Sequence, residues 1–272
     1  MPELPEVETT RRGITPHLSG VEITDVIVRN RRLRYPVSKT LDQISGDRFV
    51  DVRRRAKYLI LDLETAGSLI VHLGMSGSLR LSDPAIELKK HDHVILELSN
   101  GKQLRFHDPR RFGIYLHLPV ENPLEHRLLS KLGPEPLSDD FDLPHLKLAC
   151  RGRKAPIKQV IMDNKVVVGV GNIYASEALF RAGIRPTIAA GRLSGPRLGR
   201  LVESIREVLH ESIEQGGTTL RDFVNSDGEP GYFSQRLFVY DRFADPCRVC
   251  QTPIRQKVMG QRSTYWCPNC QK

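Results

Sequence analysis

The chain of 272 residues lacks any hydrophobic run long enough to cross a membrane. A membrane-spanning helix needs about 18 or more consecutive apolar residues, and the first residues also lack the apolar core of a secretory signal. We therefore expect a cytoplasmic protein. Internal repeats and low-complexity tracts are absent as well, so the sequence does not indicate a repeat architecture.

Cysteine is scarce and confined to one end of the sequence. Only five cysteines occur, and four of them lie in the last 26 residues. In a reducing compartment, such a cluster favours metal binding over disulfide bonds. The remaining one, Cys150, is predicted to be a small core residue.

Acidic residues are outnumbered by basic ones. The sequence has 41 Lys and Arg against 32 Asp and Glu, which gives a net charge of +9. This balance favours a polyanionic partner, either a nucleic acid or a membrane surface. With 39% hydrophobic residues, the chain can form real cores, and its length suits two domains with a small third module.

The N-terminal residues Met1, Pro2 and Glu3 can provide an unusual pair of reactive groups. If Met1 is removed, the Pro2 nitrogen is a free secondary amine that can attack an electrophilic carbon. The resulting cationic iminium has no N–H to lose, so it remains an electron sink. Glu3 could move protons for the same reaction. The alternative is that Pro2 and Glu3 merely open a helix, where proline and acidic residues are favoured.

The hydrophobic pattern changes from strands to helices along the chain. A helix over Glu6–Leu18 precedes β-rich runs that predict an antiparallel sandwich or barrel; these are Val21–Val28, Arg48–Leu63, Ser68–Leu81, His93–Leu98, Gln103–His107 and Gly113–Leu118. Beyond a Pro- and Gly-containing linker near residues 132–137, the spacing becomes helical. We therefore expect domains at residues 1–133, 134–234 and 235–272.

The four clustered cysteines form two C-x2-C pairs separated by 16 residues: Cys247 with Cys250, and Cys267 with Cys270. This spacing is typical of a zinc ribbon with one structural ion, in which each pair supplies two corners of a tetrahedron. With four thiolate ligands, the ion cannot itself activate water. The alternative, a redox pair of motifs, lacks the βαβ pattern that usually surrounds it.

Several further motifs follow the N-terminal start in a fixed order along the sequence. They are Arg-Arg-Ala-Lys-Tyr-Leu at residues 54–59, His-Leu-Gly-Met-Ser-Gly-Ser-Leu at 72–79, Asp-Pro-Arg-Arg-Phe-Gly at 108–113 and Val-Gly-Val-Gly-Asn-Ile-Tyr-Ala-Ser-Glu at 168–177. Together with the zinc signature, they resemble the formamidopyrimidine-DNA glycosylases, bacterial enzymes that excise oxidised purines from DNA. The resemblance covers nearly the whole chain.

The resemblance implies a multidomain α+β fold. Its parts would be an N-terminal antiparallel β-sandwich with an opening helix, a helical domain with a helix–two-turn–helix motif, and a C-terminal zinc ribbon. Double-stranded DNA containing an oxidised base would lie between the two halves of a monomer. The segment at residues 217–228 would cover the flipped base, and we assign no role to any one residue within it.

The resemblance also implies catalytic roles for Pro2, Glu3, Lys57 and Arg262. Pro2 would attack the sugar, Glu3 would protonate the ring oxygen, Lys57 would donate a proton and Arg262 would act during strand cleavage. Lys57 also follows three arginines and enters an apolar strand, where its pKa could fall. The alternatives are a lysine that blunts a strand edge and an arginine on a solvated hairpin face.

The remaining implied residues contact DNA. Met75, Arg110 and Phe112 would form the wedge that fills the space left by an everted base. His91 would contact DNA, and a phosphate clamp would use two further residues, Lys154 and Asn172, the latter as a helix N-cap. The alternatives are that Met75 and Phe112 are core residues, that His91 is an ordinary surface histidine, and that the clamp is an ordinary turn between helices.

The sequence therefore predicts a bifunctional DNA repair enzyme. It would excise 8-oxoguanine and formamidopyrimidines as a DNA-formamidopyrimidine glycosylase, and cleave the strand by β,δ-elimination as a lyase for apurinic or apyrimidinic sites. A related enzyme acting on oxidised pyrimidines is the second hypothesis, although residues 3–6 and the wedge set argue against it. A non-enzymatic, zinc-containing protein that binds DNA or RNA is the third.

Overall fold

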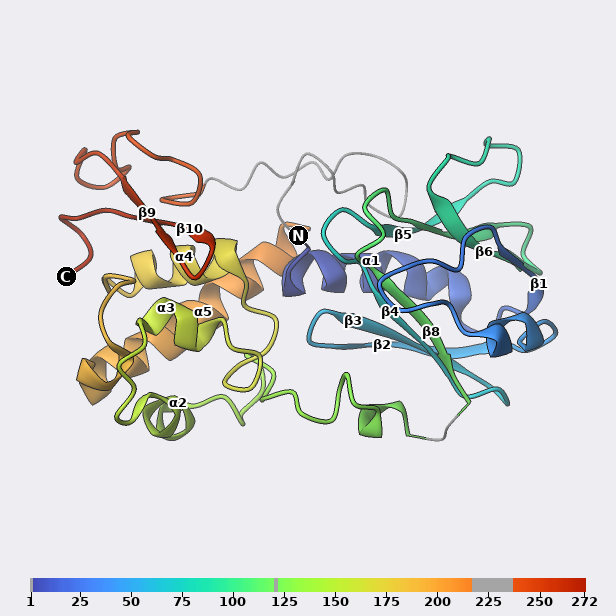
Figure 1. Ribbon diagram of the computed structural model, residues 1–272, viewed down its shortest axis with the longest axis horizontal. Coiled ribbons are helices and arrows are strands. Elements are labelled where there is room, and N and C mark those ends of the chain that lie inside the picture. The colour runs from blue at the N-terminus through green and yellow to red at the C-terminus, as the bar shows by residue number, and fades with distance from the viewer. Residues whose placement is uncertain (1, 120–121, 217–236) are drawn as a thin grey trace. The chain divides into compact units, whose positions relative to one another are not determined.

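A computed structural model describes residues 2–119, 122–216 and 237–272 (Figure 1). The chain divides into an N-terminal unit with residues 2–130 and a C-terminal unit with residues 131–215 and 237–272. The segment at residues 217–228, expected to cover a flipped base, lies outside the described residues, as does the expected domain boundary at 234.

The N-terminal unit is a sandwich of two antiparallel sheets with one long helix. Its sheets have the strand orders β1-β6-β7-β5 and β2-β3-β4-β8. The elements are α1 (Leu4–Leu18), β1 (Ile23–Val28), β2 (Phe49–Arg55), β3 (Tyr58–Leu63), β4 (Ser68–His72), β5 (Ser78–Ser82), β6 (Asp92–Leu98), β7 (Gln103–His107) and β8 (Ile114–Leu118). Short 3-10 turns occur at Lys39–Gln43 and Pro123–Glu125.

Both sheets and the helix share one hydrophobic core. Alternate residues of β3 and β7, such as Leu59, Leu61 and Phe106, point into it together with Val7 and Ile14 of α1. Period-two alternation places one face of each strand in the core and leaves the other face for polar side chains. The predicted sandwich with an opening helix is therefore confirmed.

The opening helix begins two residues earlier than predicted, at Leu4 rather than Glu6. Glu3 is the N-cap, and it forms a capping box with Glu6: the Glu3 side chain accepts from the Glu6 N–H, and the Glu3 N–H donates to Glu6 Oε2 at 2.7 Å. Reciprocal capping satisfies two helix N–H groups that would otherwise lack partners. Local hydrogen bonding, rather than hydrophobic periodicity, thus sets where the helix starts.

Two of the predicted β-rich runs each contain two strands. The run Arg48–Leu63 is interrupted by a two-residue turn at Ala56 and Lys57, and the run Ser68–Leu81 is interrupted at residues 73–77. Ala56 has a left-handed φ of 55°, which a turn between two strands requires. Gly74 and Gly77, on either side of Met75, indicate the second interruption in the sequence, whereas Ala56 and Lys57 carry no Asn-Gly or Asp-Gly signal of a hairpin turn.

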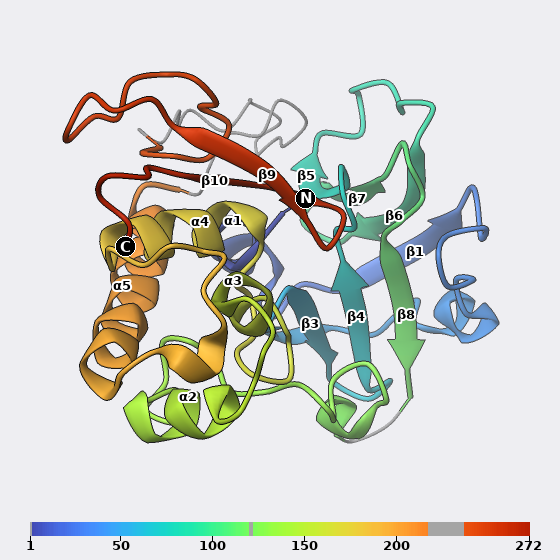
Figure 2. The same cartoon turned by 60° about the vertical axis from the view of Figure 1, so that its left-hand side comes forward.

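The C-terminal unit combines a helical bundle with a two-stranded hairpin (Figure 2). Its elements are α2 (Leu143–Cys150), α3 (Ile157–Ile161), α4 (Asn172–Arg181), α5 (Gly195–Glu214), β9 (Arg255–Met259) and β10 (Arg262–Trp266), with a 3-10 turn at Ala190–Arg192. Helix α4 packs against α5 and also against β10. Phe180 at the end of α4 joins the small core of the hairpin module. The helical domain and the ribbon predicted from the sequence are confirmed.

None of the helices within the described ranges is both long enough and apolar enough to cross a membrane.

Candidate active site and nucleic-acid interface

Pro2 lies just outside the first helix of the N-terminal unit and is buried. The proline within the first helical turn is Pro5, so Pro2 is not the residue that opens the helix. Glu3 is 2% exposed and Glu6 is fully buried, and each is held by the other's backbone or side chain. The capping box at the helix N-terminus therefore fixes the carboxylate of Glu3, the residue that follows Pro2. Such an arrangement can place an acid beside a nucleophilic amine.

Lys57 occupies the two-residue turn between β2 and β3, rather than the strand in which it was expected. It is only 8% exposed. The turn is clamped by Arg54, which donates from one guanidinium nitrogen to the Ala56 carbonyl at 3.1 Å and from another to Glu8 of α1 at 3.0 Å. Arg54 thus ties the turn that carries Lys57 to the helix that follows Pro2.

Glu8 is the anchor of this clamp. It is 8% exposed and accepts hydrogen bonds from Arg11, Arg12 and Arg54. Burial alone would raise the pKa of the Glu8 carboxyl, but the bonds and charges of Arg11 and Arg54 lower it overall. The carboxylate therefore stays charged and holds Arg54 in place. The sequence reasoning missed the pair of Glu8 and Arg54, because an acidic residue within a helix and an arginine within a basic run are common and carry no specific signal.

His72, at the end of β4, stands beside Lys57. Burial, followed by the charges of Lys57 and Arg34, lowers its pKa to about 4. Its Nδ1 accepts a hydrogen bond from the Gly74 N–H at 2.9 Å, which requires an unprotonated nitrogen. The ring also lies against Tyr58, with centroids 4.8 Å apart. A neutral His72 therefore supports the start of the loop that presents Met75.

The three predicted wedge residues lie on two adjoining loops of the N-terminal unit. A Cβ at Gly74 would meet the backbone nitrogen of Gly113 at 2.6 Å, so only glycine allows the loops to approach this closely. Met75 and Phe112 are 39% and 44% exposed. The Arg110 guanidinium stacks over the Phe112 ring at 4.9 Å. The alternative of core burial is thus wrong for both apolar residues.

His91 lies just before β6 and is half-buried. Its ring meets those of His93 and His107 at centroid distances of 5.9 and 6.0 Å. The His91 carbonyl accepts from the Asp108 N–H at 3.0 Å. This bond links His91 to the loop that carries Arg110, so one surface of the N-terminal unit holds His91 and the wedge residues.

Asn172 begins α4 in the C-terminal unit, although the N-cap itself is Gly171 and not Asn172 as predicted. The Asn172 side chain points away from its own helix end: Oδ1 accepts from Lys158 Nζ at 2.6 Å, and Nδ2 donates to the Ser263 carbonyl at 3.0 Å. Asn172 is the first helical residue, one position after the cap, and its side chain bonds to Lys158 and to the hairpin. Asn172 therefore joins the helical bundle to the ribbon.

Lys158, which the sequence reasoning did not single out, is the centre of this junction. It is 2% exposed, and its Nζ also donates to Thr264 Oγ1 at 2.9 Å and to the Ser263 carbonyl at 3.2 Å. A buried ammonium needs such partners because desolvation is costly. Lys154, three residues before α3, is by contrast exposed.

Arg262 is exposed at the start of β10, directly after the hairpin tip. The tip residues Gly260 and Gln261 both have left-handed φ angles, 53° and 62°, as a two-residue hairpin turn requires. Arg262 lines a cavity of about 250 Å³ together with Lys158 and Met162. The tip therefore holds an accessible cation next to the junction made by Lys158.

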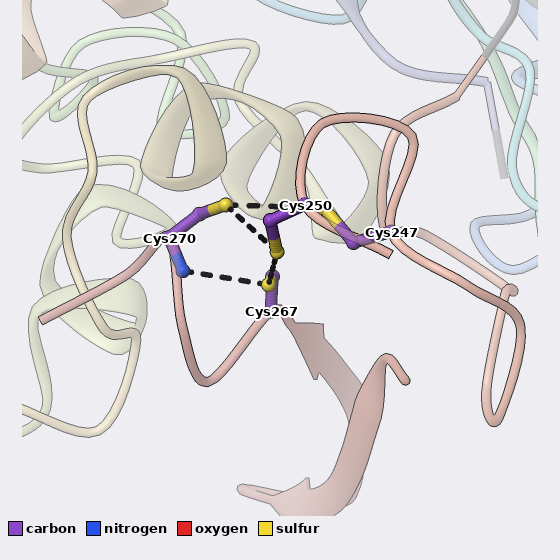
Figure 3. Close-up of side chains that lie close together, drawn as sticks. All are labelled: Cys247, Cys250, Cys267 and Cys270. Carbon is purple, nitrogen blue, oxygen red and sulfur yellow. Dashed lines mark hydrogen bonds between the residues drawn. The ribbon is translucent and has the colours of Figure 1, made fainter. Parts of the chain in front are cut away.

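The four clustered cysteines converge in the C-terminal unit (Figure 3). Their sulfur atoms all lie within 4.8 Å of one another, with Cys250 3.4 Å from both Cys267 and Cys270. Zinc–sulfur bonds of about 2.3 Å in a tetrahedron place the sulfurs roughly 3.7 Å apart. The backbone N–H groups of Val249 and Cys270 also donate to ligand sulfurs. The donor set fits one structural zinc ion, and the predicted zinc site is confirmed.

Comparison with known proteins agrees with this geometry. Family models match residues 1–115 as the formamidopyrimidine-DNA glycosylase N-terminal domain, residues 132–224 as the H2TH domain of the same enzymes, and residues 244–272 as a zinc finger found in FPG and IleRS. A formamidopyrimidine-DNA glycosylase of Methylococcus capsulatus is 59% identical over the full length of both chains. The chain belongs to the formamidopyrimidine-DNA glycosylase family.

Solved structures of this family also match the fold. A Lactococcus lactis FPG mutant, in complex with DNA containing Fapy-dG, is 32% identical, with a TM-score of 0.92 over 100% of both chains. A MutM structure in complex with DNA containing carbocyclic 8-oxo-G is 33% identical, with a TM-score of 0.90 over 100% of both chains. The sequence resemblance to this family of DNA repair glycosylases is therefore confirmed.

Within each unit of this family member, the structure brings several predicted residues together. Met75, Arg110 and Phe112 share one surface, while Lys158 bonds to Asn172 and lines one cavity with Arg262. The sequence reasoning missed Arg54 and Lys158. Arg54 holds the turn that carries Lys57, and Lys158 bonds to Asn172. A basic residue in a basic protein carries no signal of its own, so only its contacts identify it.

Proposed function

We propose that this protein excises oxidised purines such as 8-oxoguanine and formamidopyrimidines from double-stranded DNA, and then cleaves the strand at the resulting site. The observation that carries the proposal is the N-terminus. Pro2 precedes a helix whose capping carboxylate, Glu3, is buried and fixed, in a chain whose family includes enzymes seen bound to Fapy-dG and 8-oxo-G DNA. A free α-amine has a pKa of roughly 7.7–8.0, so part of it is unprotonated near neutral pH.

In the first step, the Pro2 nitrogen attacks the sugar C1′ and the bond to the damaged base breaks, so the base leaves with the bonding electrons. Glu3 protonates the ring oxygen as the sugar opens, and the nitrogen lone pair completes the iminium. The iminium acidifies the C2′ hydrogen, and its loss expels the 3′ phosphate by β-elimination. A further δ-elimination expels the 5′ phosphate. The iminium accepts the C2′–H electron pair as an enamine, the enamine passes the pair to the departing phosphate, and water finally hydrolyses the iminium to release Pro2. This electron sink is the advantage of an amine nucleophile.

Lys57 and Arg262 are proposed to serve the same reaction. Lys57 is buried in a clamped turn, which suits a proton donor of fixed position. Arg262 is exposed beside a tight hairpin tip, which suits a cation that acts on the phosphates leaving during strand cleavage. The burial of one and the exposure of the other support different roles.

The DNA contacts are proposed from exposure and placement. Met75 and Phe112 present apolar surface that can enter a base step, and Arg110 can bond to the base left unpaired. His91, Lys154 and Asn172 are proposed to contact DNA, the last two at phosphates. Zinc holds the ribbon and, with four thiolate ligands, takes no part in the chemistry.

Trapping by borohydride tests the nucleophile. Protein with Met1 removed is mixed with a duplex carrying 8-oxoguanine opposite cytosine, reduced with borohydride and analysed by mass spectrometry. We expect a covalent adduct on Pro2. Protein that retains Met1 is the control, and it should bind the duplex without forming the adduct. Full excision activity with Met1 in place would remove Pro2 from the mechanism.

A conservative variant tests Glu3 separately. Glu3→Gln keeps an oxygen that can accept from the Glu6 N–H, so the helix start should remain intact. We expect excision to fall by about 10²–10⁴-fold, the usual worth of general acid–base catalysis. Unchanged excision in a folded Glu3→Gln protein would assign Glu3 to helix capping alone.

A lesion panel decides between the first hypothesis and its relative that acts on pyrimidines. Faster cleavage of thymine glycol than of 8-oxoguanine would favour the pyrimidine enzyme. Inactivity of the Met1-processed protein on every lesion would favour the binding protein. We also propose that the protein acts in the cytoplasm, where a reducing environment keeps the four cysteine ligands available for zinc. A monomeric state remains a prediction.

A further inference from the structure

A cavity of about 340 Å³ adjoins the wedge loops of the N-terminal unit, and the catalytic proposal does not use it. Its walls include two hydroxyls and four cationic or potentially cationic side chains: Ser76, Ser78, Arg80, Lys89, His107 and Arg110. Arg110 also stacks on Phe112. The cavity therefore lies directly beside the surface proposed to enter the duplex.

The outer face of one sheet forms the floor of this cavity. Register pairs align Ser78 of β5, His107 of β7 and Asp92 of β6 in one row across three strands. Asp92 belongs to this row because β6 has a bulge between Asp92 and Val94, where two residues oppose one on β7. A bulge of this kind changes which face a side chain occupies. Here it directs a carboxylate to the polar face.

Asp92 organises the cationic side chains from beneath. It is fully buried, and its carboxylate accepts from Arg80, from His107 Nδ1 and from the Lys89 backbone N–H, all at 2.8–3.0 Å. Burial would raise the pKa of Asp92, but hydrogen bonds from His107 and Arg80 and the charge of Arg80 lower it well below its usual range. The carboxylate is thus ionised, and its hydrogen bonds fix the groups around the cavity.

The charge balance of the cavity favours an anion. Arg80, Lys89 and Arg110 contribute three positive charges, and Asp92 offsets one of them. Ser76 Oγ is buried and has no hydrogen-bond partner within the described part of the chain, and Ser78 is 3% exposed. Buried hydroxyls normally have partners. A group with several acceptor oxygens would satisfy the hydroxyls and the excess charge together.

We propose that this cavity binds one phosphate of the DNA backbone next to the wedge, through Lys89, Arg80, Ser76 and Ser78. The inference rests on DNA being the substrate. Duplex DNA carries one negative charge per about 1.7 Å of its axis, so a phosphate is always near an inserted side chain. Because the Asp92 hydrogen bonds fix the cavity in advance, the phosphate sets the depth and direction in which the wedge enters.

Salt dependence measures the number of phosphates contacted. The logarithm of the binding constant falls with the logarithm of salt concentration, with a slope of about −0.9 per phosphate. We expect Lys89→Gln to make the slope shallower by about 0.9, for a duplex carrying a stable abasic-site analogue. Between 50 and 200 mM salt, this variant should lose about 3.5-fold less affinity than the parent protein does. The neighbouring, equally exposed Lys90 does not line the cavity, so Lys90→Gln is the matched control and should keep the parent slope.

A second variant removes a hydroxyl without changing charge. Ser78→Ala should weaken binding several-fold at fixed salt and leave the slope unchanged, because no cation is lost. The proposal is overturned if Lys89→Gln and Lys90→Gln give the same slope, or if Ser78→Ala binds as the parent does. Circular dichroism confirms that each variant is folded. The abasic-analogue duplex needs no excision, so a failure here is distinct from a failure of the trapping experiment on 8-oxoguanine.

Discussion

Two hairpin turns present the two cations assigned to the chemistry, and the protein supports them in opposite ways. Lys57 lies in the turn between β2 and β3 and is 8% exposed, at one end of a sheet that belongs to a large hydrophobic core. Arg262 follows the turn between β9 and β10 and is exposed on a hairpin with few core residues. Both turns contain a non-glycine residue with a left-handed φ, Ala56 and Gln261.

The two turns differ in the interactions that hold them in place. The turn that carries Lys57 is fixed by apolar packing and by the Arg54 clamp. The hairpin that carries Arg262 is too small to bury much apolar surface, so four cysteines and the buried Lys158 hold it. In a small module, ligand bonds and a buried charge can therefore take the place of apolar area in holding the turn that presents a side chain.

Breaking the zinc site should have the largest effect. Cys247→Ser removes one of four ligands, and structural zinc contributes on the order of 10 kcal/mol to folding in small peptides. We expect loss of zinc, loss of the β9–β10 hairpin and at least a tenfold loss of DNA affinity, while the sandwich stays folded. Metal analysis and circular dichroism measure the outcome. Cys150→Ser, at a buried cysteine outside the cluster, is the control; a Cys247→Ser protein with full zinc content would contradict the site.

Lowering the pH should reduce the free energy of unfolding through His72, which supports the Met75 loop. Its folded pKa of about 4 lies below the ordinary value of 6.5. As the pH falls through 6.5, His72 becomes protonated in the unfolded chain. In the native chain His72 stays neutral until about pH 4. Stability present above pH 6.5 is therefore lost across this window, by up to about 3 kcal/mol. Chemical unfolding of His72→Gln should show a correspondingly flatter pH dependence, whereas the exposed His17→Gln should follow the parent.

Removing the buried ammonium should loosen the hairpin while leaving zinc in place. Lys158→Met keeps an unbranched side chain, one heavy atom shorter, but removes the donor to Asn172, Thr264 and the Ser263 carbonyl. We expect a loss of about 2 kcal/mol, since each charged hydrogen bond is worth roughly 1.5–3 kcal/mol and some desolvation cost is recovered. Thermal unfolding and DNA binding measure it. Lys165→Met removes an exposed charge and should change little; equal effects of the two variants would assign Lys158 to surface charge alone.

Weakening the other clamp should have the smallest effect. Arg54→Lys preserves a charge for Glu8 but cannot reach both Glu8 and the Ala56 carbonyl with a planar fork. We expect the rate of excision to fall about tenfold, the cost of one hydrogen bond of about 1.4 kcal/mol, with DNA affinity preserved. Single-turnover kinetics separates the two quantities. Arg12→Lys also keeps its charge for Glu8, from within the same helix as Glu8; an equal loss there would exclude the turn as the cause.

Much of the fold followed from local patterns. Alternation in Leu59, Leu61 and Leu63 predicted a strand, and the spacing of Cys247, Cys250, Cys267 and Cys270 predicted the zinc site, because each depends on residues close in sequence. The start of α1 and the turn at Lys57 were misplaced. A capping box and a left-handed alanine depend on backbone conformation, which hydrophobic periodicity does not report.

The sequence by itself determined the family and the metal ligands, and it predicted the chemical type of the nucleophile, since these are properties of residue identity and short spacing. Only the tertiary structure decided how the reactive groups are held. Arg54 bonds across 46 residues to Glu8, and Lys158 bonds across 106 residues to Thr264. Such partners meet only after the core has formed. Burial then makes an unsatisfied charge costly, so among many basic residues only the few whose contacts satisfy their charge can be buried.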